Sequence, residues 1–454
     1  MPKIAVVTLK RLIISSSVMC FISIAARSQI NNPPDTAAAL TLDQCVGYAL
    51  KHQPFINMAI VNVAIVKATN AINTSGWLPQ VNVTGTFTHY NTLPTGFFTD
   101  SGRIVNSKTG VVNTATPTLG VTQTIFNPAL LYAVHSAPLY VKQAQQITDS
   151  TRIEIIAAVS KSFYSLLNTL EQINVFKEDT ARLSKNVSDT YSQYVSGVAD
   201  KTNYNEAVIS LNNSLFSLRQ AIENVRPQYA LLKQVMGYPP TSHFNVVYDT
   251  LQMKNDIAFD TTQQLQFEKR IEYQVLQTNK QLQLQTVNFY RHAWLPTVGA
   301  FFNYENEFES NQFSSLFSRS YPFNYEGLSL TLPIFTGFAR TNNIKRARLQ
   351  YDLLDWQEVA LKSQIWNDYT TAAANYKSNL YNLSVSQENT GLAKETYDIV
   401  QLQYLQGVVP YLNVITAETN LITSELSYQA SLFQVLSSKI DLEKAMGIIT
   451  VNPQ

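Results

Sequence analysis

Residues 194–198 read YVSGV and residues 404–408 read YLQGV, so a Tyr-x-x-Gly motif returns after 210 positions. Met236-Gly237 returns as Met446-Gly447 at the same offset. Two further matches keep the same order along the chain: Trp77-Leu78-Pro79 with Trp294-Leu295-Pro296, and Leu119–Phe126 with Leu328–Phe335. Self-similarity at nearly one offset indicates that the chain contains two copies of a single structural unit.

The repeat also divides the chain into segments. We expect an N-terminal tail at 29–40, a first unit at 41–237, a linker at 238–262, a second unit at 263–447 and a C-terminal tail at 448–454. Each unit is long enough to form several long elements, so the two copies together account for most of the chain.

Residues 1–28 have the order basic, apolar, small that is typical of a secretory signal peptide. Three basic residues, Lys3, Lys10 and Arg11, precede the apolar stretch 12–26, and small residues follow it. A short membrane anchor is the alternative, but the stretch is shorter than the roughly 20 apolar residues of a spanning helix. Lipid attachment at Cys20 is a further alternative, and the bulky Met19 before it argues against it.

Composition and motifs exclude several other classes of protein. Charged residues make up 14% of the 454, and the formal net charge of +1 lacks the basic excess of a nucleic-acid-binding surface. Removal of the signal peptide leaves only Cys45, which excludes an internal disulfide and a Cys-rich zinc site. No histidine stands at metal-ligand spacing, and no phosphate loop or nucleophile motif occurs, so we expect no metal, cofactor or enzymatic activity. No run of 18 consecutive apolar residues follows the signal peptide, which argues against a membrane-spanning helix.

Each unit is predicted as helix, strand, loop, strand, very long helix, break and helix. The expected helices are 41–75, 128–196 and 200–236 in the first unit, and 263–293, 337–406 and 410–446 in the second. Gly197 and Gly407 suit the left-handed residue past a helix end, and Pro410 suits the first turn of the next helix. Pro138 either kinks the long helix or marks its start. The long helices would each measure about 105 Å, the length of two short helices stacked end to end.

An apolar stripe along the first long helix predicts helix packing. Its members recur at steps of three and four residues: Ile156, Val159, Phe163, Leu166, Leu170 and Ile173. Adding the offset gives a second stripe that is also apolar or aromatic: Trp366, Tyr369, Ala373, Tyr376, Leu380 and Leu383. Stripes of this period indicate a coiled-coil seam or core face rather than a ligand site.

Four segments alternate between polar and apolar residues: 81–90, 116–126, 297–308 and 325–335. Their lengths suit tilted membrane-spanning β-strands, with polar faces toward a wet lumen and apolar faces toward lipid. The predicted lumen residues are Thr84, Thr86, Thr122, Asn303, Glu305 and Thr331. Glu305 and Glu307 also form a carboxylate pair of the kind used in acid–base catalysis, but a lumen wall is the favoured interpretation. An ordinary soluble sheet with one wet face is the alternative.

Four strands cannot close a membrane barrel, because bacterial barrels begin at about eight strands. Two copies of the chain would supply eight strands, which side chains fill, and three would supply twelve, which leave an open lumen. A channel therefore requires an oligomer.

The order and spacing of these features resemble the TolC-like outer membrane efflux family. The features on which this resemblance depends are the twofold repeat, the two Trp-Leu-Pro motifs, the segment Leu332–Arg340 and the two Tyr-x-x-Gly breaks. The resemblance implies a mixed α and β membrane protein that forms a homotrimer, with a 12-stranded barrel in contact with outer membrane lipid. It also implies a long α-helical tunnel in the periplasm of a Gram-negative bacterium, with 238–262 as an equatorial belt.

The same resemblance implies the function of a passive exit duct in a tripartite efflux or type I secretion system. Such ducts work with a periplasmic adaptor (membrane fusion) protein and an inner-membrane pump. The alternative is a secreted periplasmic coiled-coil scaffold or adhesin without channel activity, which would explain the helices but not the alternating strands.

The resemblance places the periplasmic entrance and the adaptor-docking surface at the two Tyr-x-x-Gly breaks. The corresponding residues are Tyr194, Gly197, Asn203, Glu206, Tyr404, Gly407, Asn413 and Thr416. The family's charged latch is altered, because Val409 replaces an arginine and Asn203 an aspartate. Asn413 and Thr416 stand where family members often carry an aspartate ring. Our hypothesis is an entrance that is less cation-selective and opens more easily, held in part by a neutral Tyr404–Asn203 hydrogen bond.

Overall fold

The computed structural model describes residues 39–100, 102–248, 253, 256–260 and 263–450. The signal peptide at 1–28, the possible lipid site Cys20 and nearly all of the 29–40 tail lie outside these residues. The chain separates into two compact units, and the described part of the smaller one is Ala39 and Thr241–Asn245. The helices and the large sheet discussed below all belong to the larger unit.

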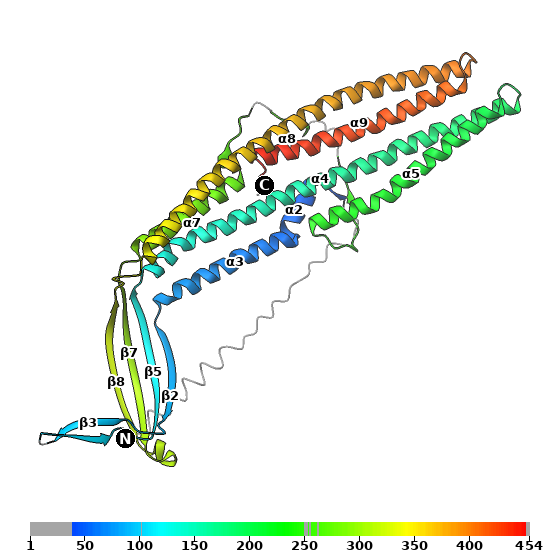
Figure 1. Cartoon of the computed structure of the whole chain (residues 1–454). Coiled ribbons are helices and arrows are strands. Elements are labelled where there is room, and N and C mark those ends of the chain that lie inside the picture. The colour runs from blue at the N-terminus through cyan, green and yellow to red at the C-terminus, as the bar shows by residue number, and fades with distance from the viewer. Residues whose placement is uncertain (1–38, 101, 249–252, 254–255, 261–262, 451–454) are drawn as a thin grey trace. The chain divides into compact units, whose positions relative to one another are not determined.

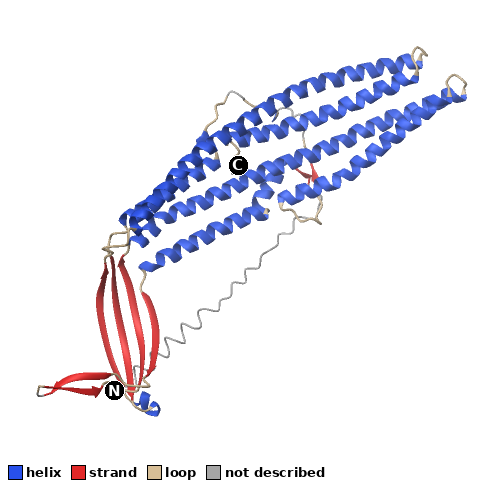
Figure 2. Ribbon diagram, in the orientation of Figure 1, coloured by secondary structure: helices blue, strands red, loops and turns tan. Residues whose placement is uncertain are grey.

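Seven helices longer than two turns form the larger unit's helical layer in the described residues (Figures 1 and 2). They are α2 (Leu42–His52), α3 (Pro54–Thr74), α4 (Pro128–Val195), α5 (Lys201–Met236), α7 (Ile271–His292), α8 (Ala339–Leu405) and α9 (Tyr411–Met446). Helices α4 and α5 form one antiparallel hairpin, and α8 and α9 form the other. Helix α4 packs against α3, α5, α7 and α9, so it is the helix that joins the two repeats.

The predicted helix 41–75 is wrong in one respect, because it is two helices that meet at Gln53 and Pro54. Gln53 is extended, with φ −64° and ψ 123°, as expected for a residue that a proline ring forces out of the helical region. The predicted helix 263–293 likewise begins later, at Ile271, after the extended residue Arg270. In both repeats the break precedes the helix that leads into the sheet.

Gln53 and Arg270 lie 217 positions apart, and each binds the end of one helix at the start of another. The Gln53 side chain donates to the carbonyls of Gln234 and Val235 at the end of α5, at 3.1 and 2.8 Å. The Arg270 guanidinium donates to the carbonyl of Ala445 at the end of α9, at 2.9 Å. These bonds satisfy carbonyls that a helix end leaves without partners. They join α5 to the start of α3, and α9 to the start of α7, as the predicted end-to-end stacking requires.

Gly447 makes the second of these junctions possible, and its replacement by alanine is expected to destabilise the protein by about 1–3 kcal/mol. Its φ is +70°, and a Cβ there would lie 2.8 Å from the carbonyl carbon and oxygen of Lys269. Gly407→Ala is the matched control, because Gly407 has φ +74° but open space around its Cβ position. Thermal unfolding of both variants separates the clash from the backbone strain. Equal losses would show that the close approach is unimportant.

Four antiparallel strands form the large sheet in the order β2-β5-β7-β8 (Figure 1). Their bounds are β2 (Gln80–His89), β5 (Asn113–Phe126), β7 (Thr297–Ser310) and β8 (Ser320–Thr331). A short sheet pairs β1 (Ala39–Leu40) with β6 (Asn245–Val246), and a hairpin pairs β3 (Thr95–Asp100) with β4 (Arg103–Lys108). The hairpin lies in a segment predicted as a loop.

The last predicted strand, 325–335, is wrong at both ends. Strand β8 ends at Thr331, because Pro333 has no N–H to donate to a neighbouring strand. It begins at Ser320, and it tolerates Pro322 because β8 is an edge strand of the sheet. Helix α8, the next element in the chain, starts at Ala339 directly after Phe338, which has φ +65°.

The predicted seam on α4 is largely confirmed, whereas its counterpart on α8 is only partly confirmed. Val159, Phe163 and Leu166 are fully buried on α4. On α8, Tyr376 and Leu383 are buried, but Trp366 and Leu380 are exposed. The difference follows from position, because α4 has neighbours on both sides and α8 lies at the edge of the helical layer. Pro138 lies inside α4, which starts at Pro128.

Helix α3 has the length and composition of a membrane span, because an 18-residue window within Pro54–Trp77 has a mean hydropathy of 1.5. The sequence prediction had excluded this because it counted only consecutive apolar residues. Ile56 packs inward, whereas Met58, Ile65 and Ile72 are exposed in the single chain. The side chain of Asn70 donates to the carbonyl of Ala137 on α4, at 2.9 Å. This helix therefore runs along α4 with an uncovered apolar side.

Candidate functional site

The two helical hairpins each end in a tight turn at the free end of the helical layer (Figure 1). Gly197 and Gly407 have φ of +75° and +74°, the left-handed conformation that glycine adopts without strain. Asp200 caps the start of α5 by accepting a hydrogen bond from the Lys201 N–H at 2.8 Å. Pro410 directly precedes α9. The structure thus forms the two turns where the Tyr-x-x-Gly motifs predicted breaks.

The tyrosines of the two motifs have different environments. Tyr194 is partly exposed and stacks on Tyr204 of α5, with ring centroids 6.5 Å apart. Tyr404 is buried against Tyr411, at 5.2 Å. The two motifs are therefore not equivalent, and only the second tyrosine is enclosed between helices.

Tyr404 makes a polar link from α8 to the first hairpin. Its phenol donates to Oε1 of Gln193 at 2.6 Å, and the side chain of Asn203 is a second hydrogen-bond partner. Burial raises the pKa of the Tyr404 phenol, so it remains a neutral donor. The predicted contact with Asn203 is present, and the sequence missed Gln193. Each such neutral bond contributes about 1 kcal/mol.

The other predicted entrance residues lie on the helices just past the turns. Glu206 is half-buried on α5, while Asn413 and Thr416 are exposed on α9. The Thr416 hydroxyl donates to the carbonyl of Leu412 one turn earlier, at 2.9 Å. The exposed residues nearest the turns are largely apolar, including Val198 and Val408. The surface at the two turns is therefore mainly uncharged.

A buried charged cluster lies deeper between α4 and α9. Arg182 of α4 lies 3.3 Å from Glu425 Oε2, 3.5 Å from Glu418 Oε1 and 3.5 Å from Asp179 Oδ1. Asp179 and Glu418 are almost completely buried, with 2% and 4% of their surfaces exposed. Asn186 donates to the second oxygen of Glu418 at 3.0 Å. This cluster ties the first repeat to the second.

The cluster has one positive charge for three carboxylates, and its pKa values reflect that imbalance. Burial, followed by repulsion from Asp179, raises the pKa of Glu418 to about 7, although Arg182 opposes the shift. Burial also raises the pKa values of Asp179 and Glu425. No local sequence signal pairs Glu418 with Arg182, so sequence analysis could not identify this cluster.

All six predicted lumen residues lie on one face of the sheet, which we call the polar face. The register pairs Thr84 with Thr118, Thr118 with Glu305, and Thr297 with Thr331. Directly paired residues share a face, and alternate residues along a strand share it too. The polar face comprises Thr84, Thr86, Thr122, Asn303, Glu305 and Thr331, together with Glu307 and Glu309.

The polar face also carries aromatic residues that sequence analysis did not assign to it. Phe301, Phe323 and Tyr325 follow the same alternation, and the Tyr325 phenol donates to Oε1 of Glu305 at 2.8 Å. The ring of Phe301 lies 6.2 Å from that of Tyr325. Glu305 therefore has a structural partner, which favours a wall residue over a catalytic one.

The opposite face of the sheet is mainly apolar, and we call it the apolar face. Its members include Val81, Val83, Phe87, Leu119, Val121, Phe302, Tyr304, Phe308, Leu328 and Leu330, with Asn306, Asn324 and Glu326 among the polar exceptions. At the end away from the helices, Phe313 packs on Phe87 at 5.8 Å and Phe317 on Phe308 at 5.2 Å. The aromatic loop predicted at 309–324 thus extends this face.

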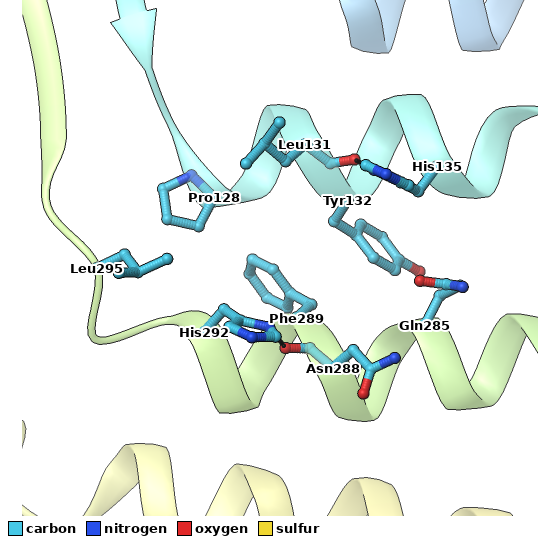
Figure 3. A pocket seen from close by; sticks show the side chains of 9 residues that line it. All are labelled: Pro128, Leu131, Tyr132, His135, Gln285, Asn288, Phe289, His292 and Leu295. Carbon is cyan, nitrogen blue, oxygen red and sulfur yellow. Dashed lines mark hydrogen bonds between the residues drawn. The ribbon is translucent and has the colours of Figure 1, made fainter.

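A pocket of about 320 Å³ lies where α4 begins and α7 ends, beside the sheet (Figure 3). Tyr132 and Phe289 pack in it with ring centroids 5.3 Å apart. His135 and His292 each hold Nδ1 against a backbone carbonyl one turn earlier, at 2.7 and 2.8 Å. The carbonyl accepts, so each Nδ1 carries the proton. The contact between Tyr132 and Phe289 therefore joins the start of α4 to the end of α7, beside the sheet.

Comparison with known proteins gives a consistent result at the level of family and fold. The family model described as outer membrane efflux protein matches residues 46–238 and again 269–448. No curated protein matches. Three solved structures illustrate the similarity in fold. VceC from Vibrio cholerae has a TM-score of 0.70 at 16% identity, covering 89% of this chain and 96% of its own.

CmeC from Campylobacter jejuni has a TM-score of 0.68 at 16% identity, covering 89% of this chain and 85% of its own. The open state of MtrE from Neisseria gonorrhoeae has a TM-score of 0.68 at 16% identity, covering 89% of this chain and 88% of its own. All three are described as outer membrane proteins or channels. Because the family model covers most of the sequence in two successive matches, the chain belongs to the outer membrane efflux protein family.

Proposed function

We propose that three copies of this chain form the outer membrane exit duct of a tripartite efflux or type I secretion system. The duct is passive, with its helical part in the periplasm, and it docks to a periplasmic adaptor and an inner-membrane pump. The observation that carries the proposal is a sheet with one polar face, one apolar face and two unpaired edges, β2 and β8, in the described chain. Three such sheets joined edge to edge would make a closed 12-stranded barrel.

The helical layer supports the same assembly, because it also ends in two apolar edges. Leu349, Leu353 and Trp356 are exposed on α8, and Met58 and Ile65 are exposed on α3. A contact between unlike edges generates a ring when the rotation closes. Joining α8 of one copy to α3 of the next would bury both stripes, while the polar face of the sheet would line the lumen.

The test is membrane fractionation followed by chemical cross-linking and single-channel recording of the detergent-extracted protein. We expect outer membrane location, a cross-linked trimer and conductance. Trp356→Glu should abolish the trimer, because it places a charge on the proposed edge. Val198→Glu is the matched control, since Val198 is exposed at a turn away from both edges. A monomeric protein that never conducts would favour the scaffold or adhesin instead.

The proposed entrance lies at the two Tyr-x-x-Gly turns, where Asn413 and Thr416 leave no aspartate ring. We expect millimolar Mg²⁺ or Ca²⁺, added on the helical side of the channel, to leave conductance unchanged. The physical reason is that an amide and a hydroxyl are weaker ligands for hard divalent cations than carboxylates. Asn413→Asp combined with Thr416→Asp should create block by these ions. Tight block of the wild type would contradict the prediction.

A further inference from the structure

Apolar side chains are exposed where β8 leads into α8. Ile334 is 92% exposed and Phe338 is 68% exposed, and Leu332 and Phe335 are exposed beside them. The rings of Phe335 and Phe338 pack edge to face, with centroids 5.7 Å apart. We call residues 332–338 the edge joint, because β8 is an edge strand of the sheet. The single chain therefore leaves most of the apolar surface of the edge joint uncovered.

The backbone of the edge joint is strained at Phe338. Gly337 and Phe338 have φ of +59° and +65°, and the N–H of Ala339 closes the turn by donating to the carbonyl of Thr336 at 3.1 Å. Turns with positive φ at both central residues favour glycine, asparagine or aspartate there. Among the described residues, Phe338 is the one non-glycine residue with positive φ. Such strain persists where surrounding contacts hold it, and the single chain supplies few contacts to this exposed ring.

The first repeat starts its long helix without a strained residue. Phe126 corresponds to Phe335 in the two repeats, and the counterpart of Phe338 is then Ala129. There Asn127 is extended, with φ −150°, and its side chain accepts a hydrogen bond from the Ala129 N–H at 2.8 Å. A helix that follows the sheet therefore does not need a phenylalanine at positive φ, so the ring of Phe338 requires another explanation.

The interior of the chain shows how two neighbouring joints pack. Strands β5 and β7 are paired, so the joint between β5 and α4 lies next to the joint between α7 and β7. Pro128 and Leu131 of the first joint line one pocket with Phe289 and Leu295 of the second (Figure 3). Leu295 belongs to the second Trp-Leu-Pro motif. A joint that follows a strand thus packs against a Trp-Leu-Pro joint of the other repeat.

The proposed trimer would repeat this arrangement between copies. Closing the barrel would pair β8 of one copy with β2 of the next, and the end of β8 and the start of β2 both lie at the helical end of the sheet. The edge joint would then lie beside the first Trp-Leu-Pro motif of the next copy. Leu78 of that motif and Ile72 of α3 are both exposed in the single chain. Both sides therefore present uncovered apolar side chains at the same level.

The two sides of this contact also differ in size in a complementary way. When Trp77 is aligned with Trp294, Ile72 corresponds to Phe289 and Ser75 to His292. The surface before β2 therefore lacks two rings that the interior joint has. The edge joint compensates on the opposite side, because it carries a phenylalanine where the interior joint carries an alanine.

We propose that Phe338 of each copy packs against Ile72 and Leu78 of the next copy, at the level where the sheet meets the helices. The contact would remove these apolar side chains from water and would hold Phe338 at its positive φ. This inference rests on the proposed trimeric duct and names the residues that join its copies between the strands and the helices.

A cysteine pair tests the contact in the full chain in outer membranes. Leu78→Cys combined with Phe338→Cys, treated with a short bis-maleimide, should give a covalent trimer on a denaturing gel. The two positions lie on opposite edges of one chain, so the link must join two copies. Leu78→Cys combined with Phe313→Cys is the matched control, because Phe313 is 67% exposed but lies at the other end of the sheet. Cys45 is buried, which protects it from the reagent.

Amine cross-linking of the same samples reports whether the trimer exists. A trimer by amine cross-linking, with no thiol-linked product from the pair at 78 and 338, would overturn this proposal and leave the duct intact. A monomer by both reagents would overturn the duct and this proposal together.

Phe338→Gly separates assembly from folding, because glycine adopts positive φ without strain. We expect the variant to keep its helical content by circular dichroism, while the dissociation constant of the trimer in detergent rises at least about tenfold for the loss of a buried ring. Phe313→Ala is the control and should leave dissociation unchanged. An unchanged dissociation constant in Phe338→Gly would contradict the proposal. If a Phe338→Cys thiol in the intact trimer then reacted with a lipid-soluble maleimide, membrane lipid would be the occupant instead.

Discussion

Replacing Arg182 by leucine should lower the free energy of unfolding by about 3–5 kcal/mol, the usual cost of removing one partner from a buried ion pair. Arg182 is the only cation in contact with Asp179, Glu418 and Glu425 in the described chain. Without it, three carboxylates remain between α4 and α9 with mutual repulsion and no countercharge. The cost should be greatest at high pH, where all three are ionised.

Thermal unfolding of the purified protein measures this effect. Arg219→Leu is the matched control, because Arg219 pairs with Glu223 on α5 but is 75% exposed. Exposed pairs contribute at most about 1 kcal/mol, so this control should unfold close to the wild type. If Arg182→Leu lost no more stability than Arg219→Leu, the cluster would be hydrated rather than buried. Adding Glu418→Gln to Arg182→Leu should recover part of the loss.

The stability of the wild type should fall by about 2.5 kcal/mol as pH rises from 5 to 8, because of Glu418 alone. Its pKa is raised from 4.5 to about 7, so the folded state binds more protons than the unfolded state in this interval. Stability falls with pH wherever the folded state holds the extra proton. The raised pKa values of Asp179 and Glu425 act in the same direction.

Unfolding midpoints across this pH range check the prediction, and Glu418→Gln should remove most of the slope. Glu358 does not interfere, because hydrogen bonds from Lys280 and Lys362 lower its pKa to about 2. The stabilisation that Glu358 contributes is present above pH 4.5 and is lost only as the pH falls from there toward 2. A wild-type midpoint that rose between pH 5 and 8 would contradict the assigned role of Glu418.

Local sequence patterns predicted most of the architecture. The Tyr-x-x-Gly motifs identified both turns because only a residue that tolerates positive φ ends a helix in this way, and Gly197 and Gly407 do so. The stripe through Val159 and Phe163 identified the packed side of α4, since apolar spacing of three and four residues is a property of one helix. Polar and apolar alternation likewise assigned Thr84 and Asn303 to one face of the sheet.

Some boundaries were predicted incorrectly although a local cue existed. Pro54 ends the first helix at Gln53, and Pro333 keeps Leu332 and Ile334 out of β8. In each case apolar periodicity continued past the proline and was given more weight than the missing N–H. The start of α7 at Ile271 had no such cue, because it depends on the bond from Arg270 to Ala445.

The sequence by itself determined the duplication, the long helices, the four strands and the two faces of the sheet. These features depend on the conformations and spacings of residues that are near each other in the chain. Only the tertiary structure decided which distant groups meet: Gln193 with Tyr404, Gln53 with the end of α5, and Arg182 with Glu418. In each of these contacts a side chain of one helix meets a group on another helix. The contact stabilises the fold through burial and charge, which arise only when those helices pack together.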